Sequence, residues 1–169
     1  MKYYKVPTST QSDDKNTASS AVVGQSPHTD NRFITVLDQI NQVQGLEILT
    51  KQGNWVQVTI PKGAVVVSVG DAFKVWSNGR LHASRHRVIM SSSSTVDNKL
   101  EDRYSCALFG LPEEESIIQP QNELADMEHP LLYRPFILAG FFKYITTNIY
   151  ALSDNPLRNY AGIELVLQN

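Results

Sequence analysis

The 169-residue chain contains a single cysteine, Cys106. One cysteine cannot form an internal disulfide bond, and such sparse use fits a reducing compartment. The chain also lacks an excess of either charge: 15 Lys and Arg residues stand against 17 Asp and Glu residues, which gives a net charge of −2. The chain therefore has neither a basic region nor a charged tail that would indicate a nucleic-acid partner.

Long hydrophobic runs are missing as well. The longest strongly apolar run covers 136–142 and ends at Lys143, far short of the about 20 residues that a membrane-spanning helix needs. The first residues, 1–6, lack the apolar core of a signal peptide. The 41% of hydrophobic residues is enough for the core of one domain. We therefore expect a cytoplasmic protein without a membrane partner.

Several short segments are rich in β-branched and aromatic residues and are bounded by glycine, proline or polar residues, which predicts strands. The predicted strands are 1–6, 33–37, 46–49, 55–58, 64–69, 86–90 and 103–109. The segments 46–49 and 55–58 flank Gly53-Asn54 and predict a hairpin. The segment 64–69 is almost continuously β-branched, which is typical of a buried strand.

The segment 136–152 has the spacing of an amphipathic helix, and Asp71 is expected to cap a short helix that continues through Trp76. The segments 8–20 and 91–102 are polar and are predicted to be loops, of which the first is mobile. Many short strands with one late helix indicate a mainly β protein, built as a sandwich or a double-sheet roll.

The tripeptide His28-Thr29-Asp30 is the first candidate for chemistry. Alternate residues of a strand point to the same face, so His28 and Asp30 share one side. Together with His86, at the start of another predicted strand, they can occupy one face of an octahedral metal ion, as in non-haem Fe(II) sites that bind O2. The alternative is ordinary structure: a histidine in a turn, an Asx-type turn at Asp30 and a surface histidine.

Two further histidines compete as ligands. His82 comes only a few residues after the predicted turn at Asn78-Gly79, whereas His86 begins a strand, and this register favours His86. His129 precedes Pro130 in a predicted loop and is interpreted as structural.

Arg103 and Ser105 are the second candidate, since residues two apart on a strand share a face. A guanidinium beside a hydroxyl can bind a carboxylate through charge-assisted hydrogen bonds. The alternation over 103–109 predicts that both faces are covered, and a buried arginine needs an anion such as a dicarboxylate. The alternative is a solvated arginine on an edge strand. Tyr3 and Tyr4 are a weaker element, because adjacent tyrosines on a strand usually serve packing.

A series of short motifs occurs in a fixed order along the chain: 26–30, 45–47, 70–71, 77–82, 86–88, 103–105 and 128–136. Together they resemble the C-terminal catalytic half of plant Fe(II)/2-oxoglutarate-dependent dioxygenases. The sequences of 78–82 and 128–136 most resemble those of the branch of glucosinolate-forming and steroidal-alkaloid-hydroxylating dioxygenases. The resemblance spans roughly residues 1–163.

The resemblance implies a double-stranded β-helix (jelly-roll) core, truncated at its N-terminal side, over 1–135, followed by a C-terminal helix and tail over 136–169. It also implies roles for six residues. Fe(II) would be held by His28, Asp30 and His86, and the distal carboxylate of 2-oxoglutarate would be bound by Arg103, Ser105 and Tyr4. Tyr4 is preferred to Tyr3 because it directly precedes Lys5-Val6-Pro7, as the family's tyrosine precedes its proline-containing turn.

The implied activity is hydroxylation or desaturation of a small specialised metabolite by O2, coupled to decarboxylation of 2-oxoglutarate to succinate, with ascorbate as a supporting reductant. Three alternatives stay open: an oxidase of the same superfamily that does not use 2-oxoglutarate, a truncated non-catalytic fragment that keeps the metal motif, and a zinc hydrolase. The last is disfavoured because zinc prefers tetrahedral sites with three histidines or an added cysteine. The sequence specifies neither the substrate nor the oligomeric state.

Overall fold

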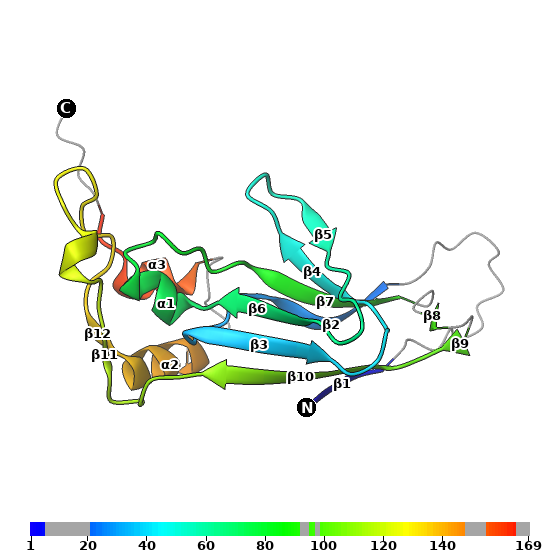
Figure 1. Ribbon diagram of the computed structural model, residues 1–169. Coiled ribbons are helices and arrows are strands. Elements are labelled where there is room, and N and C mark those ends of the chain that lie inside the picture. The colour runs from blue at the N-terminus through cyan, green and yellow to red at the C-terminus, as the bar shows by residue number, and fades with distance from the viewer. Residues whose placement is uncertain (6–20, 92–94, 97–98, 148–154, 165–169) are drawn as a thin grey trace. The chain divides into compact units, whose positions relative to one another are not determined.

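A computed structural model describes residues 1–5, 21–91, 95–96, 99–147 and 155–164 of the chain (Figure 1). The predicted mobile loop 8–20 and the end of the predicted helix 136–152 lie outside these residues. The chain forms two compact units. Unit 1 comprises 1–29, 35–68 and 84–108, and unit 2 comprises 30–34, 69–83 and 109–169.

Strands dominate the described residues, which confirms the mainly β class. The strands are β1 (Lys2–Tyr4), β2 (Ala21–His28), β3 (Ile34–Gln39), β4 (Leu46–Leu49), β5 (Trp55–Gln57), β6 (Val65–Val69), β7 (His86–Ser91), β8 (Thr95–Val96), β9 (Lys99–Leu100), β10 (Arg103–Gly110), β11 (Ile117–Ile118) and β12 (Phe136–Ile137). The helices are α1 (Asp71–Trp76), the 3-10 turn η1 (Asn122–Leu124), α2 (Leu138–Thr147) and α3 (Pro156–Ala161).

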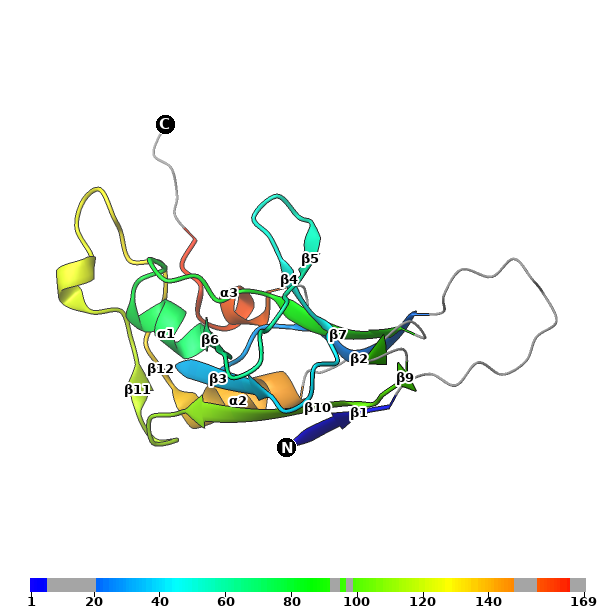
Figure 2. The same cartoon turned by 45° about the vertical axis from the view of Figure 1, so that its right-hand side comes forward.

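Two four-stranded sheets build unit 1, in the orders β1-β10-β3-β6 and β2-β7-β4-β5. The views in Figures 1 and 2 both show β2 and β7 above β10. The side chains between the sheets form one buried cluster of Tyr4, Val43, Val88 and Met90. Tyr4 comes from the first sheet, and Val88 and Met90 come from the second. The two sheets therefore pack face to face, as a jelly-roll requires.

The predicted hairpin is confirmed. β4 and β5 pair antiparallel, and the Thr50 N–H donates to the Asn54 carbonyl at 2.8 Å. Gly53 has a φ of 83°, a conformation that residues with a side chain rarely adopt. The predicted turn at Asn78-Gly79 is also present, with φ values of 50° and 79°.

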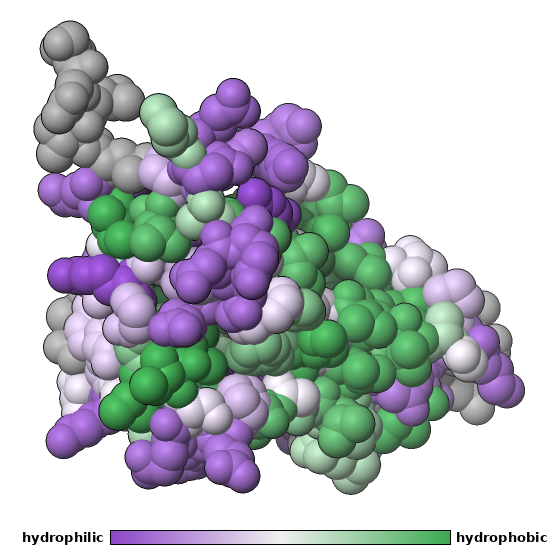
Figure 3. Space-filling view, turned by 60° about the vertical axis from the view of Figure 1, so that its left-hand side comes forward, coloured by the Kyte–Doolittle hydropathy of each residue, from purple (hydrophilic) through white to green (hydrophobic). Residues whose placement is uncertain are grey.

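Two strands are less covered than the sequence predicts. Val65 and Val67 on β6 are 53% and 62% exposed, although the run 64–69 predicts a buried strand. On β10, Arg103 is buried whereas Leu108 is 71% exposed, so only one face of this strand is covered. The sequence conceals this alternation because apolar residues occupy both faces. Figure 3 shows hydrophobic residues at the surface of the molecule on the side it displays.

The core of unit 2 includes residues from α1, α2 and α3. Its members are Ala72, Val75, Ile118, Tyr133, Phe136, Leu138, Phe141, Leu157 and Ala161. α1 covers the predicted helix, but Gly70 is its N-cap and the cap has no side-chain hydrogen bond, so the predicted capping role of Asp71 is wrong. α3 is unpredicted; its N-terminus is capped by the Asn155 side chain, which accepts from the Arg158 N–H at 3.1 Å. No described helix could cross a membrane.

Candidate metal and cosubstrate site

His28 ends β2 and His86 begins β7, and the register of the two strands pairs them directly. Their ring centroids lie 4.3 Å apart. On its other side, β7 pairs with β4, where Ile48 is opposite His86. Strands on both sides thus fix the backbone of His86 relative to that of His28.

Backbone carbonyls set the proton position on both imidazoles. The Nδ1 of His28 lies 2.8 Å from the Ser26 carbonyl oxygen, and the Nδ1 of His86 lies 3.2 Å from that of Ser84. Because a carbonyl oxygen can only accept, each Nδ1 carries the proton and donates it. In the neutral form of this tautomer, Nε2 is the atom whose lone pair can bind a metal ion, and the Nδ1 bond orients the ring.

Asp30 follows His28 by two residues. One ligand atom from each of His28, Asp30 and His86 lies within 4.8 Å of the other two, and all three residues are partly buried. Two imidazole nitrogens and one carboxylate oxygen at these separations fit the ligand set of a non-haem Fe(II) site. Among the described residues, these three form the group of histidine, cysteine and acidic side chains that is close enough to hold a metal ion.

The backbone at Asp30 is held by the segment that begins α1. The Asp71 N–H donates to the Asp30 carbonyl at 2.7 Å, and the Gly70 N–H donates to the Phe33 carbonyl at 2.8 Å. A Cβ on Gly70 would lie 2.0 Å from the Arg32 carbonyl oxygen, so only glycine permits this close approach. Gly70 belongs to the motif 70–71, whose structural role the sequence alone does not indicate.

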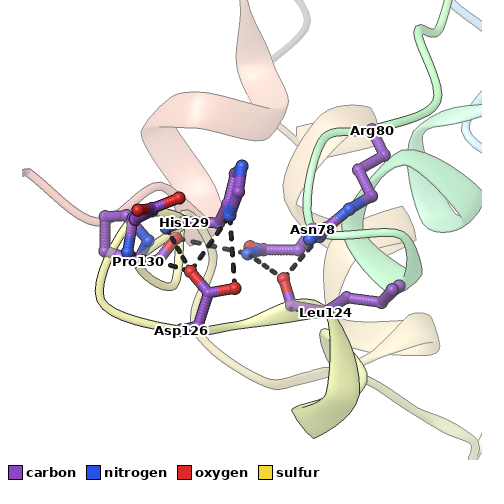
Figure 4. Close-up of polar contacts among 7 residues, drawn as sticks. Asn78, Arg80, Leu124, Asp126, His129 and Pro130 are labelled. Atoms are coloured by element: carbon purple, nitrogen blue, oxygen red, sulfur yellow. Dashed lines mark hydrogen bonds and ion pairs between the residues drawn. The ribbon is translucent and has the colours of Figure 1, made fainter.

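The two competing histidines lie elsewhere. His82 is exposed. His129 belongs to a loop organised by Asp126, whose Oδ1 accepts from the His129 N–H at 2.7 Å and from its Nδ1 at 3.0 Å (Figure 4). Asn78 also fixes this loop, since its Nδ2 donates to the carbonyls of Leu124 and Pro130. These bonds agree with the structural interpretation of His129.

Arg103 and Ser105 lie in unit 1, on the buried face of β10, and are 1% and 2% exposed. Nη1 of Arg103 donates to Ser105 Oγ at 3.1 Å, and Nη2 donates to Gln39 Oε1 at 3.3 Å, whereas Nε has no partner. Burial lowers the pKa of the guanidinium, but an arginine in a protein keeps its proton. The described residues thus contain a buried cation whose hydrogen-bond partners are both neutral.

The two candidate tyrosines have different surroundings. Tyr4 is opposite Arg103 in the β1–β10 pair, is 8% exposed, and has its ring centroid 5.5 Å from Arg103 Cζ. Burial raises the pKa of the Tyr4 phenol, and the nearby Arg103 charge opposes the shift. Tyr3 is 52% exposed and donates to Asp102 at 2.8 Å. Tyr4 is therefore the tyrosine on the same face as Arg103.

Gln39 is a polar residue of this site that the sequence analysis missed. It ends β3 and is 6% exposed. Within the run 33–39, nothing distinguishes this glutamine from a surface residue until β3 is placed beside β10 in the sheet.

Comparison with known proteins agrees with this geometry. The model of the 2OG-Fe(II) oxygenase superfamily matches residues 1–112. A curated relative from Arabidopsis thaliana, probable 2-oxoglutarate-dependent dioxygenase AOP1.2, is 38% identical over 140 residues, which make up 83% of this chain and 41% of the relative. The chain thus spans about two fifths of the length of that relative.

Solved structures show the same likeness. The rice dioxygenase for auxin oxidation matches with a TM-score of 0.71 and 34% identity, over 83% of this chain and 45% of the rice protein. JOX2, crystallised with 2OG, Fe and JA, matches with a TM-score of 0.64 and 32% identity, over 73% of this chain and 34% of JOX2. The predicted resemblance and jelly-roll fold are confirmed, and the chain belongs to the 2OG-Fe(II) oxygenase superfamily.

Proposed function

We propose that the chain carries the Fe(II) and 2-oxoglutarate sites of a dioxygenase that oxidises a small molecule. The observation that supports this most strongly is Arg103, a guanidinium buried without an anion and with an unpartnered Nε. A buried charge is costly unless it is paired, so such a residue is best explained by an anionic ligand that binds there.

His28, Asp30 and His86 would hold the metal ion through two Nε2 atoms and one carboxylate oxygen. Bound Fe(II), with 2-oxoglutarate as cosubstrate, supplies the activation of O2. The contribution of the chain is positional: the carbonyls of Ser26 and Ser84 orient the two rings.

Arg103 would neutralise the distal carboxylate of 2-oxoglutarate, and the hydroxyls of Ser105 and Tyr4 would add hydrogen bonds. Arg103 is 1% exposed, and where water is largely excluded a charge-assisted bond is stronger than in water. The raised pKa of Tyr4 means that its hydroxyl keeps its proton at neutral pH and can donate to a carboxylate.

The finer parts of the function are also proposals. The substrate would be a small specialised metabolite, and the outcome hydroxylation or desaturation; the names of the relatives above, with auxin oxidation and bound JA among them, support the substrate class. The single cysteine, Cys106, supports a cytoplasmic location. The division into a jelly-roll over 1–135 and a helix and tail over 136–169 remains a proposal as well.

The direct experiment is turnover of 2-oxoglutarate. The chain, loaded with Fe(II) under anaerobic conditions and then supplied with 2-oxoglutarate and O2, should form succinate even without a substrate, although slowly. The His86→Ala variant should form none, and the His82→Ala variant should match the wild-type chain. Equal succinate formation by the His86→Ala variant would eliminate the assigned site. Oxygen consumption that does not depend on 2-oxoglutarate would indicate an oxidase instead.

A second candidate is a binding fragment that holds the metal and 2-oxoglutarate without turnover. Its support is length, because the chain spans about two fifths of a curated relative. This candidate predicts cooperative thermal unfolding, with a midpoint that rises on addition of metal and 2-oxoglutarate, but no succinate.

A further inference from the structure

We infer that Gln39 is a binding residue for the distal carboxylate of 2-oxoglutarate, donating a hydrogen bond to it from Nε2. This inference rests on the proposed function and adds a residue to its cosubstrate site. Sequence motifs do not indicate Gln39; its role follows from the hydrogen bonding of two buried side chains in unit 1.

The orientation of the Gln39 amide is fixed by its neighbour. Arg103 has donors and no acceptor, so the Gln39 atom that faces Nη2 at 3.3 Å must be the carbonyl oxygen Oε1. The amide nitrogen Nε2 therefore points elsewhere. It is buried and has no hydrogen-bond partner. A buried donor without an acceptor is unfavourable, so an acceptor is expected when the site is in use.

A second buried donor also has no hydrogen-bond partner. Nε of Arg103 is buried and unpartnered, like Nε2 of Gln39, and the two side chains are joined by the Nη2–Oε1 hydrogen bond. A ligand group that satisfies both must accept two hydrogen bonds. A carboxylate has two oxygens with about four acceptor positions and no proton to donate. An ammonium group, which has donors and no acceptor, would satisfy neither.

Gln39 also contributes through Arg103. Its Oε1 and Ser105 Oγ are the two acceptors that fix the plane of the guanidinium among the described residues. Residue 39 therefore acts twice, by positioning the cation and by donating to the anion. A glutamate at this position would keep the acceptor for Arg103, but it would neutralise the cation and repel the carboxylate.

The test compares two ligands and two variants. 2-Oxoglutarate and 2-oxopentanoate share the keto acid end, but only the first has a distal carboxylate. Binding of each is measured by calorimetry, with Zn(II) as a redox-inactive metal, for the wild-type chain, Gln39→Met and the control Gln57→Met. Gln57 is an exposed glutamine on β5, so its replacement makes the same chemical change outside the site.

Gln39→Met should weaken the binding of 2-oxoglutarate about 10-fold or more, because a hydrogen bond to a charged group is lost. The same variant should leave 2-oxopentanoate almost unchanged, and Gln57→Met should affect neither ligand. Equal weakening of both ligands, or no weakening, would overturn the inference. If the wild-type chain itself does not bind 2-oxoglutarate, then the proposed function fails, and the role of Gln39 fails with it.

A direct readout does not depend on any variant folding. In the Zn(II)-loaded wild-type chain, the side-chain NH2 signals of Gln39 should move downfield when 2-oxoglutarate is added, as a proton does when it forms a hydrogen bond to a carboxylate. They should not move downfield with 2-oxopentanoate. Signals that stay in place with 2-oxoglutarate bound would restrict Gln39 to the support of Arg103 and overturn the inference.

Discussion

His28 and His86 are directly opposite each other in the β2–β7 pair, with ring centroids 4.3 Å apart. The strand register sets this separation, and the Ser26 and Ser84 carbonyls set the ring orientations. Two imidazoles held this way are oriented by the protein itself. Little reorganisation is then needed on binding, which favours affinity.

The first prediction concerns these rings. His86→Ala should weaken Fe(II) binding by at least about 100-fold, because even the loss of a residue behind a metal ligand costs about 10–100-fold. The measurement is an anaerobic titration with Fe(II). His82→Ala is the control, since His82 is exposed and outside the group. Wild-type affinity in the His86→Ala variant would remove His86 from the ligand set.

The sequence was sufficient for the fold class and the family, because motifs in a fixed order identify a family even where each is weak alone. It was also sufficient to place Arg103 and Ser105 on one face, since strand alternation is a local property. The choice of Tyr4 over Tyr3 came from the resemblance and stays a prediction. Burial of whole strands was less predictable. Val65 and Val67 look like core residues, but their exposure depends on which neighbours the fold supplies.

Gln39 and Gly70 were beyond sequence reasoning for a different reason. The role of Gln39 depends on Arg103, which lies far along the chain and meets it only through the β3–β10 arrangement. The role of Gly70 depends on the approach of the Arg32 carbonyl. Residue type alone carries no information about such contacts, so only the structure could reveal them.

The second prediction concerns the stability cost of the Arg103 site. Arg103→Met removes the buried charge but leaves Gln39 without its partner, whereas the double change Gln39→Leu/Arg103→Met removes both polar groups. The double variant should therefore be more stable than Arg103→Met alone, by about 1–3 kcal/mol. Without ligand, it should be at least as stable as the wild-type chain.

Thermal unfolding with and without 2-oxoglutarate checks this second prediction. At a ligand concentration of 100 times Kd, the free energy of unfolding of the wild-type chain should rise by about 2.7 kcal/mol. That of neither variant should rise. A double variant clearly less stable than the wild-type chain would mean that Arg103 and Gln39 hold the fold together and are not kept for a ligand.

The third prediction is a pH dependence in the loop of Figure 4. The His129 backbone N–H, followed by the His129 side chain, holds the pKa of Asp126 below its ordinary value of 3.8. Because the folded-state pKa is lower, the ionised carboxylate stabilises the loop above that ordinary value, and this contribution is lost as the pH falls through the folded pKa. Amide exchange at His129 should then accelerate in acid relative to other loops.

Asp126→Asn is the control for this effect. An asparagine has no charge to lose, so the acid-dependent part of the exchange at His129 should disappear. If exchange at His129 in the wild-type chain followed the same pH course as in Asp126→Asn, the carboxylate would not be the group that fixes the loop.

The fourth prediction compares two glycines. Gly70→Ala places a Cβ 2.0 Å from the Arg32 carbonyl oxygen, whereas a Cβ at Gly110 meets nothing closer than 3.6 Å. The atom that the new Cβ would meet at Gly70 belongs to the backbone and cannot rotate away. Gly70→Ala should therefore lower the free energy of unfolding by about 3 kcal/mol or more, which is the upper end of the usual cost of overpacking. Gly110→Ala should be nearly neutral. Chemical denaturation of both variants measures the difference.

Gly70→Ala should also weaken the binding of the metal ion. The adjacent Asp71 N–H donates to the Asp30 carbonyl, so displacing this backbone moves Asp30 away from its present position beside His28. Metal affinity should therefore fall in the fraction that stays folded, while Gly110→Ala keeps the wild-type affinity. A folded Gly70→Ala chain with unchanged Fe(II) binding would show that the position of Asp30 does not depend on the segment at the start of α1.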